Sequence, residues 1–190
     1  MRVRTITAAM SVGFLLLAGS ALAQTAASPQ PEDAQLQPGL NATFLYDDFQ
    51  VIDKMPTAPE KIAKGKHGKP VANLDASSQS GELWDAGAKT RYGAYFTGLV
   101  KLPAGKVVLS AISNDGVRVM VGGVRVLNDP EPHPDRRTES APLNIATAGW
   151  YPILVQYFQR NGKARLTVSW QVDGGSETVI PPEAFARLNK

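Results

Sequence analysis

Apolar and polar residues alternate along short segments through most of the second half of the chain. An alternation with a period of two predicts β-strands, because successive side chains of a strand point to opposite faces of the sheet. The pattern is cleanest from Ala164 to Val172, where every second residue is apolar. By the same criterion we expect strands at 40–49, 92–102, 107–112, 117–121, 124–127, 150–158 and 178–180.

Glycine-rich turns separate the expected strands. Gly122-Gly123 and Asn161-Gly162 are two-residue hairpin signals, because such turns favour residues that tolerate a positive φ angle. Short strands joined by such turns, with no expected helix longer than a turn or two, predict an all-β fold, an antiparallel β-sandwich or barrel. The side chains that we expect to be buried in its core include Phe96, Leu109, Val119, Val155, Val168 and Trp170.

Two segments lack this alternation. Residues 55–80 contain several prolines and lysines, and residues 128–142 are polar and rich in proline. We expect both to be surface loops, because irregular backbone needs water as a hydrogen-bonding partner. The lysines between Lys54 and Lys69 form either a solvated face or a patch for an anionic polymer.

The first residues have the pattern of an export signal. Arg2 and Arg4 precede an apolar run, and Ala21-Leu22-Ala23 is a small-residue cleavage site. We therefore expect residues 1–23 to be a signal peptide and Gln24 to be the mature N-terminus. The mature protein is then expected to be periplasmic or secreted.

The mature chain is expected to have two parts. Residues 24–38 are rich in Pro, Gln and Ala and have almost nothing to bury, so they are predicted to be a disordered leader. Residues 39–190 are long enough for one folded domain with a full core. No segment after the leader is apolar enough to be expected to span a membrane.

The composition narrows the classes of function. The formal net charge of +3 falls close to neutrality once Arg2 and Arg4 are removed, which gives no reason to expect nucleic acid as a partner. The chain has no cysteine, which excludes disulfides, zinc–thiolate sites and thiol catalysis. His67 and His133 are not at metal-ligand spacing, and no catalytic motif follows the leader. We therefore predict a protein without enzymatic activity. A small hydrolase is a third hypothesis, for which no motif in the sequence gives support.

The order of these elements resembles a known family, the domain first defined on the protective antigen of anthrax toxin and called the PA-fourteen domain. The resemblance extends over most of 39–188 and rests on an ordered set of segments, which are 39–44, 95–100, 103–107, 113–123, 148–153 and 162–166. It implies a β-sandwich or barrel, in agreement with the alternation. Members occur in glycosidases, toxins, proteases and cell-wall adhesins, so the resemblance implies carbohydrate binding.

The resemblance also implies a position for a metal ion. In the lectin-like members two consecutive aspartates hold a calcium ion that contacts sugar hydroxyls, and the matching pair here is Asn114-Asp115. The amide supplies no charge, and calcium favours anionic oxygens, so we expect at most a weak calcium site. Alternatively the pair supplies only turn geometry. Asp173 is a candidate further ligand-binding residue, if the loop that carries it lies at the same end of the sandwich.

Two aromatic residues are candidates for direct contact with a sugar. Trp84 and Trp150 are expected at strand edges or turns, where an indole face can stack on the apolar face of a sugar ring. Alternatively they pack against the edge of the sandwich.

Together these observations predict an exported, non-catalytic module that binds carbohydrate or a cell-envelope glycan. The alternative is a structural or adaptor domain that binds another envelope protein, through the Pro-rich leader or a sheet edge.

Overall fold

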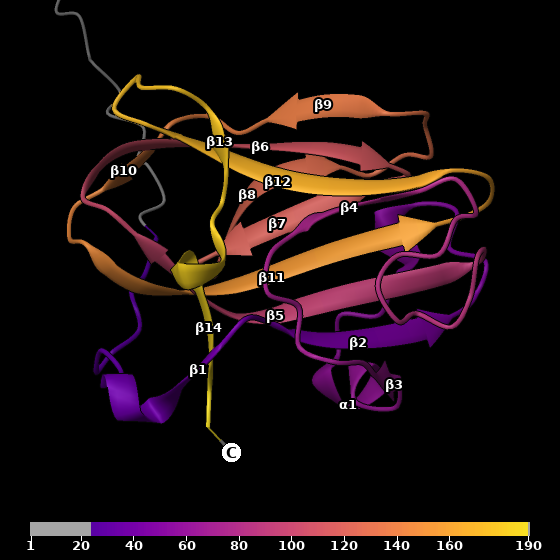
Figure 1. Cartoon of the computed structure of the whole chain (residues 1–190), viewed down its shortest axis with the longest axis horizontal. Coiled ribbons are helices and arrows are strands. Elements are labelled where there is room, and N and C mark those ends of the chain that lie inside the picture. The colour runs from indigo at the N-terminus through magenta and orange to yellow at the C-terminus, as the bar shows by residue number, and fades with distance from the viewer. Residues whose placement is uncertain (1–23, 190) are drawn as a thin grey trace, which may run out of the picture.

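The computed structural model describes residues 24–189 and contains two antiparallel sheets that pack into a sandwich (Figure 1). The eight-stranded sheet is built from β1 (Leu36–Pro38), β2 (Asn41–Tyr46), β3 (Lys66–His67), β5 (Tyr92–Leu102), β7 (Val117–Val121), β8 (Val124–Asp129), β11 (Gly149–Gln159) and β14 (Phe185–Leu188). The six-stranded sheet is built from β4 (Asp75–Ser78), β6 (Gly105–Asn114), β9 (Arg136–Glu139), β10 (Leu143–Ile145), β12 (Ala164–Val172) and β13 (Thr178–Val179). The predicted fold class is confirmed.

Two long strand pairs define the sandwich. β5 and β11 pair antiparallel along their whole length, from Leu102 opposite Gly149 to Tyr92 opposite Gln159. In the other sheet, β6 and β12 pair antiparallel from Val107 opposite Val172 to Asn114 opposite Arg165. The backbone hydrogen bonds of these pairs fix which turns meet at each end of the molecule.

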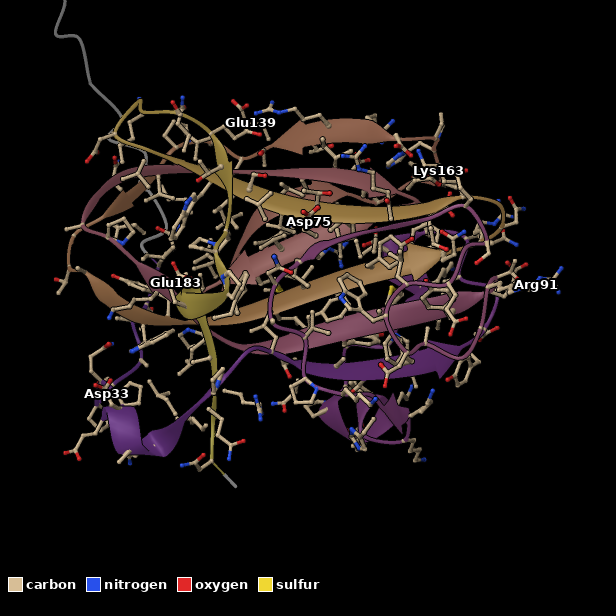
Figure 2. The ribbon with its side chains drawn as sticks, viewed as in Figure 1. Asp33, Asp75, Arg91, Glu139, Lys163 and Glu183 are labelled. Carbon is tan, nitrogen blue, oxygen red and sulfur yellow. The ribbon has the colours of Figure 1, made fainter. Side chains whose placement is uncertain are left out.

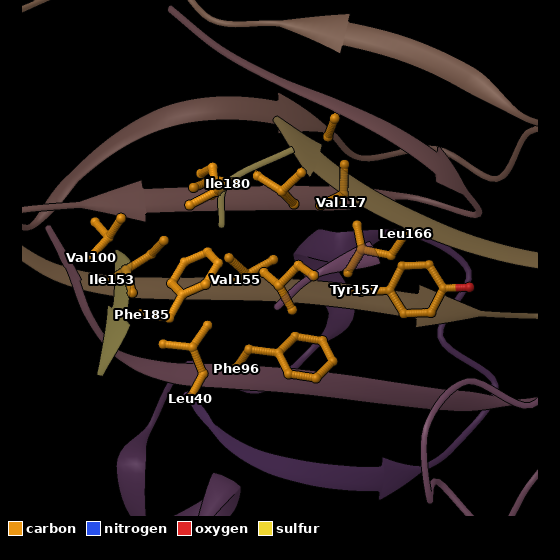
Figure 3. Close-up of a cluster of buried hydrophobic side chains, with 14 of the residues drawn as sticks. Leu40, Phe96, Val100, Val117, Ile153, Val155, Tyr157, Leu166, Ile180 and Phe185 are labelled. Atoms are coloured by element: carbon orange, nitrogen blue, oxygen red, sulfur yellow. The ribbon is translucent and has the colours of Figure 1, made fainter. Parts of the chain in front are cut away.

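The core lies between the two sheets (Figure 3). Five of the six side chains predicted to be buried are at most 1% exposed, namely Phe96, Leu109, Val119, Val155 and Val168. The prediction for Trp170 is wrong in degree, since this residue is only partly buried and packs against the core cluster. An indole is large and is rarely covered completely.

Helical structure in the described residues is short. It consists of α1 (Pro59–Ile62) and the 3-10 turns η1 (Asp33–Gln35), η2 (Ile52–Lys54) and η3 (Pro182–Ala184). Between residues 24 and 189 no helix has both the length and the apolar character to cross a membrane.

The two segments predicted as surface loops contain strands. β3 and β4 lie within 55–80, where β3 pairs with β2 and β4 pairs with β12. β9 lies within 128–142 and pairs with β6, and Asp129, His133 and Ser140 are buried nearby. These strands are short and polar, so their pairing depends on neighbouring edges that accept them and leaves no alternation in the sequence.

The prediction of a disordered leader at 24–38 is also wrong. β1 pairs with β14, and the N–H of Thr25 donates to the carbonyl of Gly122. The Gln30 side chain donates to the Trp150 carbonyl and accepts from the Trp150 N–H, at 3.0 and 2.7 Å. The leader therefore binds through backbone groups of the sheet edge and needs little apolar surface of its own. The predicted signal peptide, residues 1–23, lies outside the described residues.

Candidate functional site

Four loop segments meet at one end of the sandwich, which we call the loop end. They contribute Asp48 after β2, Thr90 and Arg91 before β5, the Asn114-Asp115 turn between β6 and β7, and Arg160 with Asn161 between β11 and β12. Figure 2 labels Arg91 and Lys163 at this end and Asp33 and Glu183 at the other. The antiparallel register of β12 with β6 and of β5 with β11 brings these turns together.

The Asn114-Asp115 turn is held in place by its neighbours. The two residues are joined by a cis peptide bond. The Tyr157 hydroxyl donates to the Asn114 carbonyl at 2.5 Å, and the Asn114 side-chain amide donates to Asp135 Oδ1 at 3.2 Å. The orientation of this turn is therefore fixed by protein groups on both sides of it.

Asp115 is buried, with 7% of its surface exposed. Its Oδ2 accepts a hydrogen bond from the backbone N–H of Arg160 at 2.8 Å. Burial raises the pKa of Asp115 above its usual range, although the backbone N–H groups of Arg160 and His133 act in the opposite direction. This carboxylate thus ties the β6–β7 turn to the β11–β12 turn.

A pocket of about 350 Å³ opens beside this connection and is lined by Asp48, Thr90, Arg91, Arg160 and Asn161. We call it the loop-end pocket. Its lining offers two guanidinium groups, one carboxylate, one hydroxyl and one amide, so it can donate and accept hydrogen bonds. The volume is near the lower end of the range typical of small-molecule sites.

Asp135 organises the charges on the other side of the turn. Its carboxylate accepts from the Asn114 amide, from Lys163 Nζ at 2.8 Å and from Arg165 at 3.3 Å. The hydrogen bond from Lys163 is the largest of the effects that lower the pKa of Asp135, to about 2. Asp135 is therefore committed to these cationic partners.

Trp84 lies apart from the loop-end pocket. Its indole is partly buried and packs edge-on against Phe96, with the ring centroids 4.7 Å apart. It lines a different pocket of about 220 Å³, together with Lys69, Pro70, Val71 and Asp85. The packing alternative for Trp84 is thus realised, and a flank of the ring still borders a cavity.

Trp150 and Asp173 lie at the opposite end of the sandwich, which we call the leader end. Trp150 is the second residue of β11 and is hydrogen-bonded to the leader. Asp173 follows β12 and accepts from the N–H of Lys106 at 2.7 Å. Lys106 and Asn114 stand near opposite ends of β6, about 25 Å apart at a rise of roughly 3.3 Å per residue. The expectation that Asp173 shares an end with Asn114-Asp115 is therefore wrong.

The oxygen atoms that the Asn114-Asp115 turn offers at the loop end are too few to hold a calcium ion without ligands from elsewhere. Calcium takes roughly six to eight oxygen ligands and favours carboxylates. Asp115 is the carboxylate of this turn, and one of its oxygens already accepts from Arg160. Among residues 24–189, no three His, Cys, Asp or Glu side chains come together in a way that could hold a metal. Calcium binding by Asn114 and Asp115 stays a prediction.

The sequence interpretation missed the five residues that line the loop-end pocket. A partial signal was present, because Asn161-Gly162 is a hairpin turn and must lie at one end of the sandwich. Placing this turn beside Asn114-Asp115 requires knowing that β12 pairs with β6. The sequence of either strand does not indicate which strand it pairs with. Arg91 has a positive φ of 55°, and the residues around it do not predict this backbone conformation.

The described residues thus form a two-layer β-sandwich with a polar pocket among the loops at one end. The PA14 domain family model matches residues 37–184, and the chain belongs to that family. The resemblance seen in the sequence is thereby confirmed. A comparison with curated proteins gives no match.

Several solved structures share the fold. The PA14 domain of MpAFP antifreeze protein is 18% identical, with a TM-score of 0.64 over 84% of this chain and 95% of that one. The PA14 sugar-binding domain from an RTX adhesin is 20% identical, with a TM-score of 0.59 over 79% of this chain and 98% of that one. The epithelial adhesin 6 A domain of Candida glabrata, in complex with Galβ1-3GlcNAc, is 11% identical, with a TM-score of 0.64 over 89% and 94%.

Other similar structures belong to longer chains. An anti-sigma factor domain-containing protein is 16% identical, with a TM-score of 0.65 over 80% of this chain. The present chain spans about half of that protein, 48% of its length. At these identities the likenesses show a common fold.

Proposed function

We propose that this protein is an exported, non-catalytic module that binds carbohydrate in the loop-end pocket. The observation that carries the proposal is the pocket itself, in which Thr90, Asn161 and Asp48 stand beside two arginines and the Asn114-Asp115 turn. Sugars present many hydroxyl groups that both donate and accept hydrogen bonds, and this lining can meet both needs. The structural neighbours support the same class of ligand, since one is a sugar-binding domain and another holds a galactosyl disaccharide.

The pocket is preorganised, which favours binding. Asp115 and the Arg160 backbone link two turns, and the N–H of Arg91 donates to the Arg160 carbonyl at 3.1 Å. Three of the loop segments are therefore fixed relative to one another before a ligand arrives. A rigid site loses less conformational entropy on binding than a flexible loop does.

A glycan array tests this proposal. The purified protein is applied once with calcium and once with EDTA, which also tests whether binding requires calcium. We expect retention of a restricted set of glycans. Replacement of the exposed pocket residue Asn161 by Ala should weaken binding about three- to tenfold, as for loss of a neutral hydrogen bond.

The matched control is Asn144→Ala, which removes another exposed Asn, on β10. It should leave glycan binding unchanged. If no glycan is retained with or without calcium, the carbohydrate proposal is wrong. A pull-down from envelope extract then tests the alternative, an adaptor domain that binds another envelope protein.

A further inference from the structure

The charge of the loop-end pocket narrows the kind of sugar that it fits, provided that the proposed function holds. Its lining contains two guanidinium groups, Arg91 and Arg160, and a single carboxylate, Asp48. The shortest approach between Asp48 Oδ1 and Arg160 Nε is 3.8 Å, too long for a hydrogen bond. The lining itself therefore holds two guanidinium groups and one carboxylate, while the carboxylate of the buried Asp115 lies behind it at the Arg160 backbone N–H.

Most other arginines are already committed to protein acceptors. Arg118 donates to Asp53 and Asn128, Arg136 donates to Asp129, and Arg137 donates to Glu177. In contrast, the side chains of Arg91 and Arg160 donate no hydrogen bond to any residue between 24 and 189. Arg160 Nε is moreover shielded from solvent without a partner there.

A guanidinium group that donates to no protein acceptor keeps its capacity to donate to an anionic ligand. Arg160 lines the pocket and 36% of its side chain is exposed, so a ligand in the pocket can reach part of that side chain. The backbone hydrogen bond from Arg91 to Arg160 keeps the two residues adjacent.

We propose that the loop-end pocket binds a carboxylated sugar, a uronic acid residue of an acidic glycan, with its carboxylate between Arg91 and Arg160. A guanidinium group matches a carboxylate through two parallel N–H···O hydrogen bonds. Thr90, Asn161 and Asp48 remain for the ring hydroxyls. The Asp48 carboxylate can also accept hydrogen bonds from hydroxyl groups, which makes the pocket suited to a sugar and not to a bare anion.

The test uses two disaccharides that differ in the carboxylate. Digalacturonate and digalactose have the same ring configuration, but the former carries a carboxylate where the latter carries a hydroxymethyl group. Calorimetry with the purified protein in EDTA should show digalacturonate binding at least about tenfold more tightly, as expected for a charge-assisted hydrogen bond. Added salt should weaken this binding, because the charges lie near solvent.

Variants assign the effect to the arginines. Arg91→Gln and Arg160→Gln should each weaken digalacturonate binding about tenfold and leave the melting temperature unchanged. Arg160→Lys should retain an intermediate affinity, because it keeps the charge and loses the planar fork. The control Arg125→Gln removes an exposed arginine that lines a different pocket on β8 and should have no effect.

Each of the other possible results would refute a specific part of the proposal. Equal binding of the two disaccharides, or unchanged binding in both Arg→Gln variants, refutes the acidic-sugar inference and leaves the proposed function standing. Binding of galactose 6-sulfate without binding of digalacturonate refutes the carboxylate and keeps only an anionic sugar. Absence of binding by every sugar, here and on the glycan array, refutes the proposed function as well.

Discussion

The two ends of the sandwich are built from the same kind of strand and turn, but their polar groups differ in how many hydrogen bonds they make within the protein. At the leader end the turns satisfy one another, since Gln30 bonds to both backbone groups of Trp150 and Asp173 bonds to the N–H of Lys106. At the loop end, Arg91 and Arg160 face a pocket and donate no side-chain hydrogen bond within 24–189. The comparison indicates what a binding site among turns requires. The protein must hold the polar side chains in place and leave their hydrogen-bonding groups available to a ligand.

The largest effect is expected from a change in the core on which both ends depend. Val168 is 0% exposed and lies in the middle of β12. Val168→Asp should unfold the domain, because an unpaired buried charge costs several kcal/mol against a total stability of about 5–15 kcal/mol. Circular dichroism and thermal melting measure this loss. A variant that melts like the wild type would show that this face of β12 is not in the core.

A smaller effect should separate the leader end from the rest of the structure. Gly122 and Gly123 form the β7–β8 turn with φ angles of 57° and 81°, so Ala at either position costs roughly 1–2 kcal/mol in a left-handed conformation. A Cβ at Gly122 would also lie 2.4 Å from the Thr25 backbone nitrogen, whereas a Cβ at Gly123 meets nothing within 4 Å. Gly122→Ala should therefore be the less stable variant.

The additional loss should come from displacement of the leader. Limited proteolysis followed by mass spectrometry should detect faster cleavage near Thr25 in Gly122→Ala than in Gly123→Ala. Equal melting temperatures and equal protection of the leader in the two variants would contradict its docking on the β7–β8 turn.

The smallest effect concerns the pH dependence at the loop end. Lys163 is foremost among the groups that hold the pKa of Asp135 at about 2 in the folded protein, below its ordinary value of 3.8. A depressed pKa stabilises the fold above pH 3.8, and this contribution is lost as the pH falls from there through about 2. Asp135→Asn should therefore lose less stability than the wild type over that interval, by about 1 kcal/mol or less for a pair near the surface.

Asp115 provides the opposing control. Burial raises its pKa, so its ionised form opposes folding at neutral pH and protonation relieves that cost as the pH falls. Asp115→Asn should be at least as stable as the wild type at neutral pH, since an amide oxygen can still accept from the Arg160 N–H. Urea unfolding at several pH values measures both variants. Parallel stability curves for wild type and Asp135→Asn would refute the role assigned to Asp135.

The sequence predicts the long strands well because their signal is local. The alternation from Ala164 to Val172 requires one buried face wherever β12 is placed. The arrangement of turns requires knowledge of strand partners, and this is why Asp173 was expected near Asn114 and lies at the other end of β6. The order of the leader was not predicted either. Backbone hydrogen bonds attach this segment, whereas its composition indicates only how much apolar surface it can bury.

The site was predictable only in part. Asn114-Asp115, the pair that the resemblance singled out, lies beside Arg160 at the loop end, but calcium binding there stays a prediction. Arg91 and Arg160 come from loops that carry no recognised motif. The two arginines are candidates for ligand binding because their side chains donate no hydrogen bond to a protein acceptor. This is a property of the folded structure and cannot be seen in the sequence. A lone arginine in a sequence gives no indication of whether a carboxylate will neutralise it.

The pairing of β1 with β14 has a consequence for engineering the molecule. Leu36 stands opposite Leu188 in this pair, so the first and last strands of the domain enter and leave side by side. A short linker can therefore join these two points, and new ends can be opened at Gly174, where a Cβ would meet no atom within 4 Å. Such a circular permutant keeps the loop-end pocket intact, because neither the linker nor the new ends involve the residues that line it.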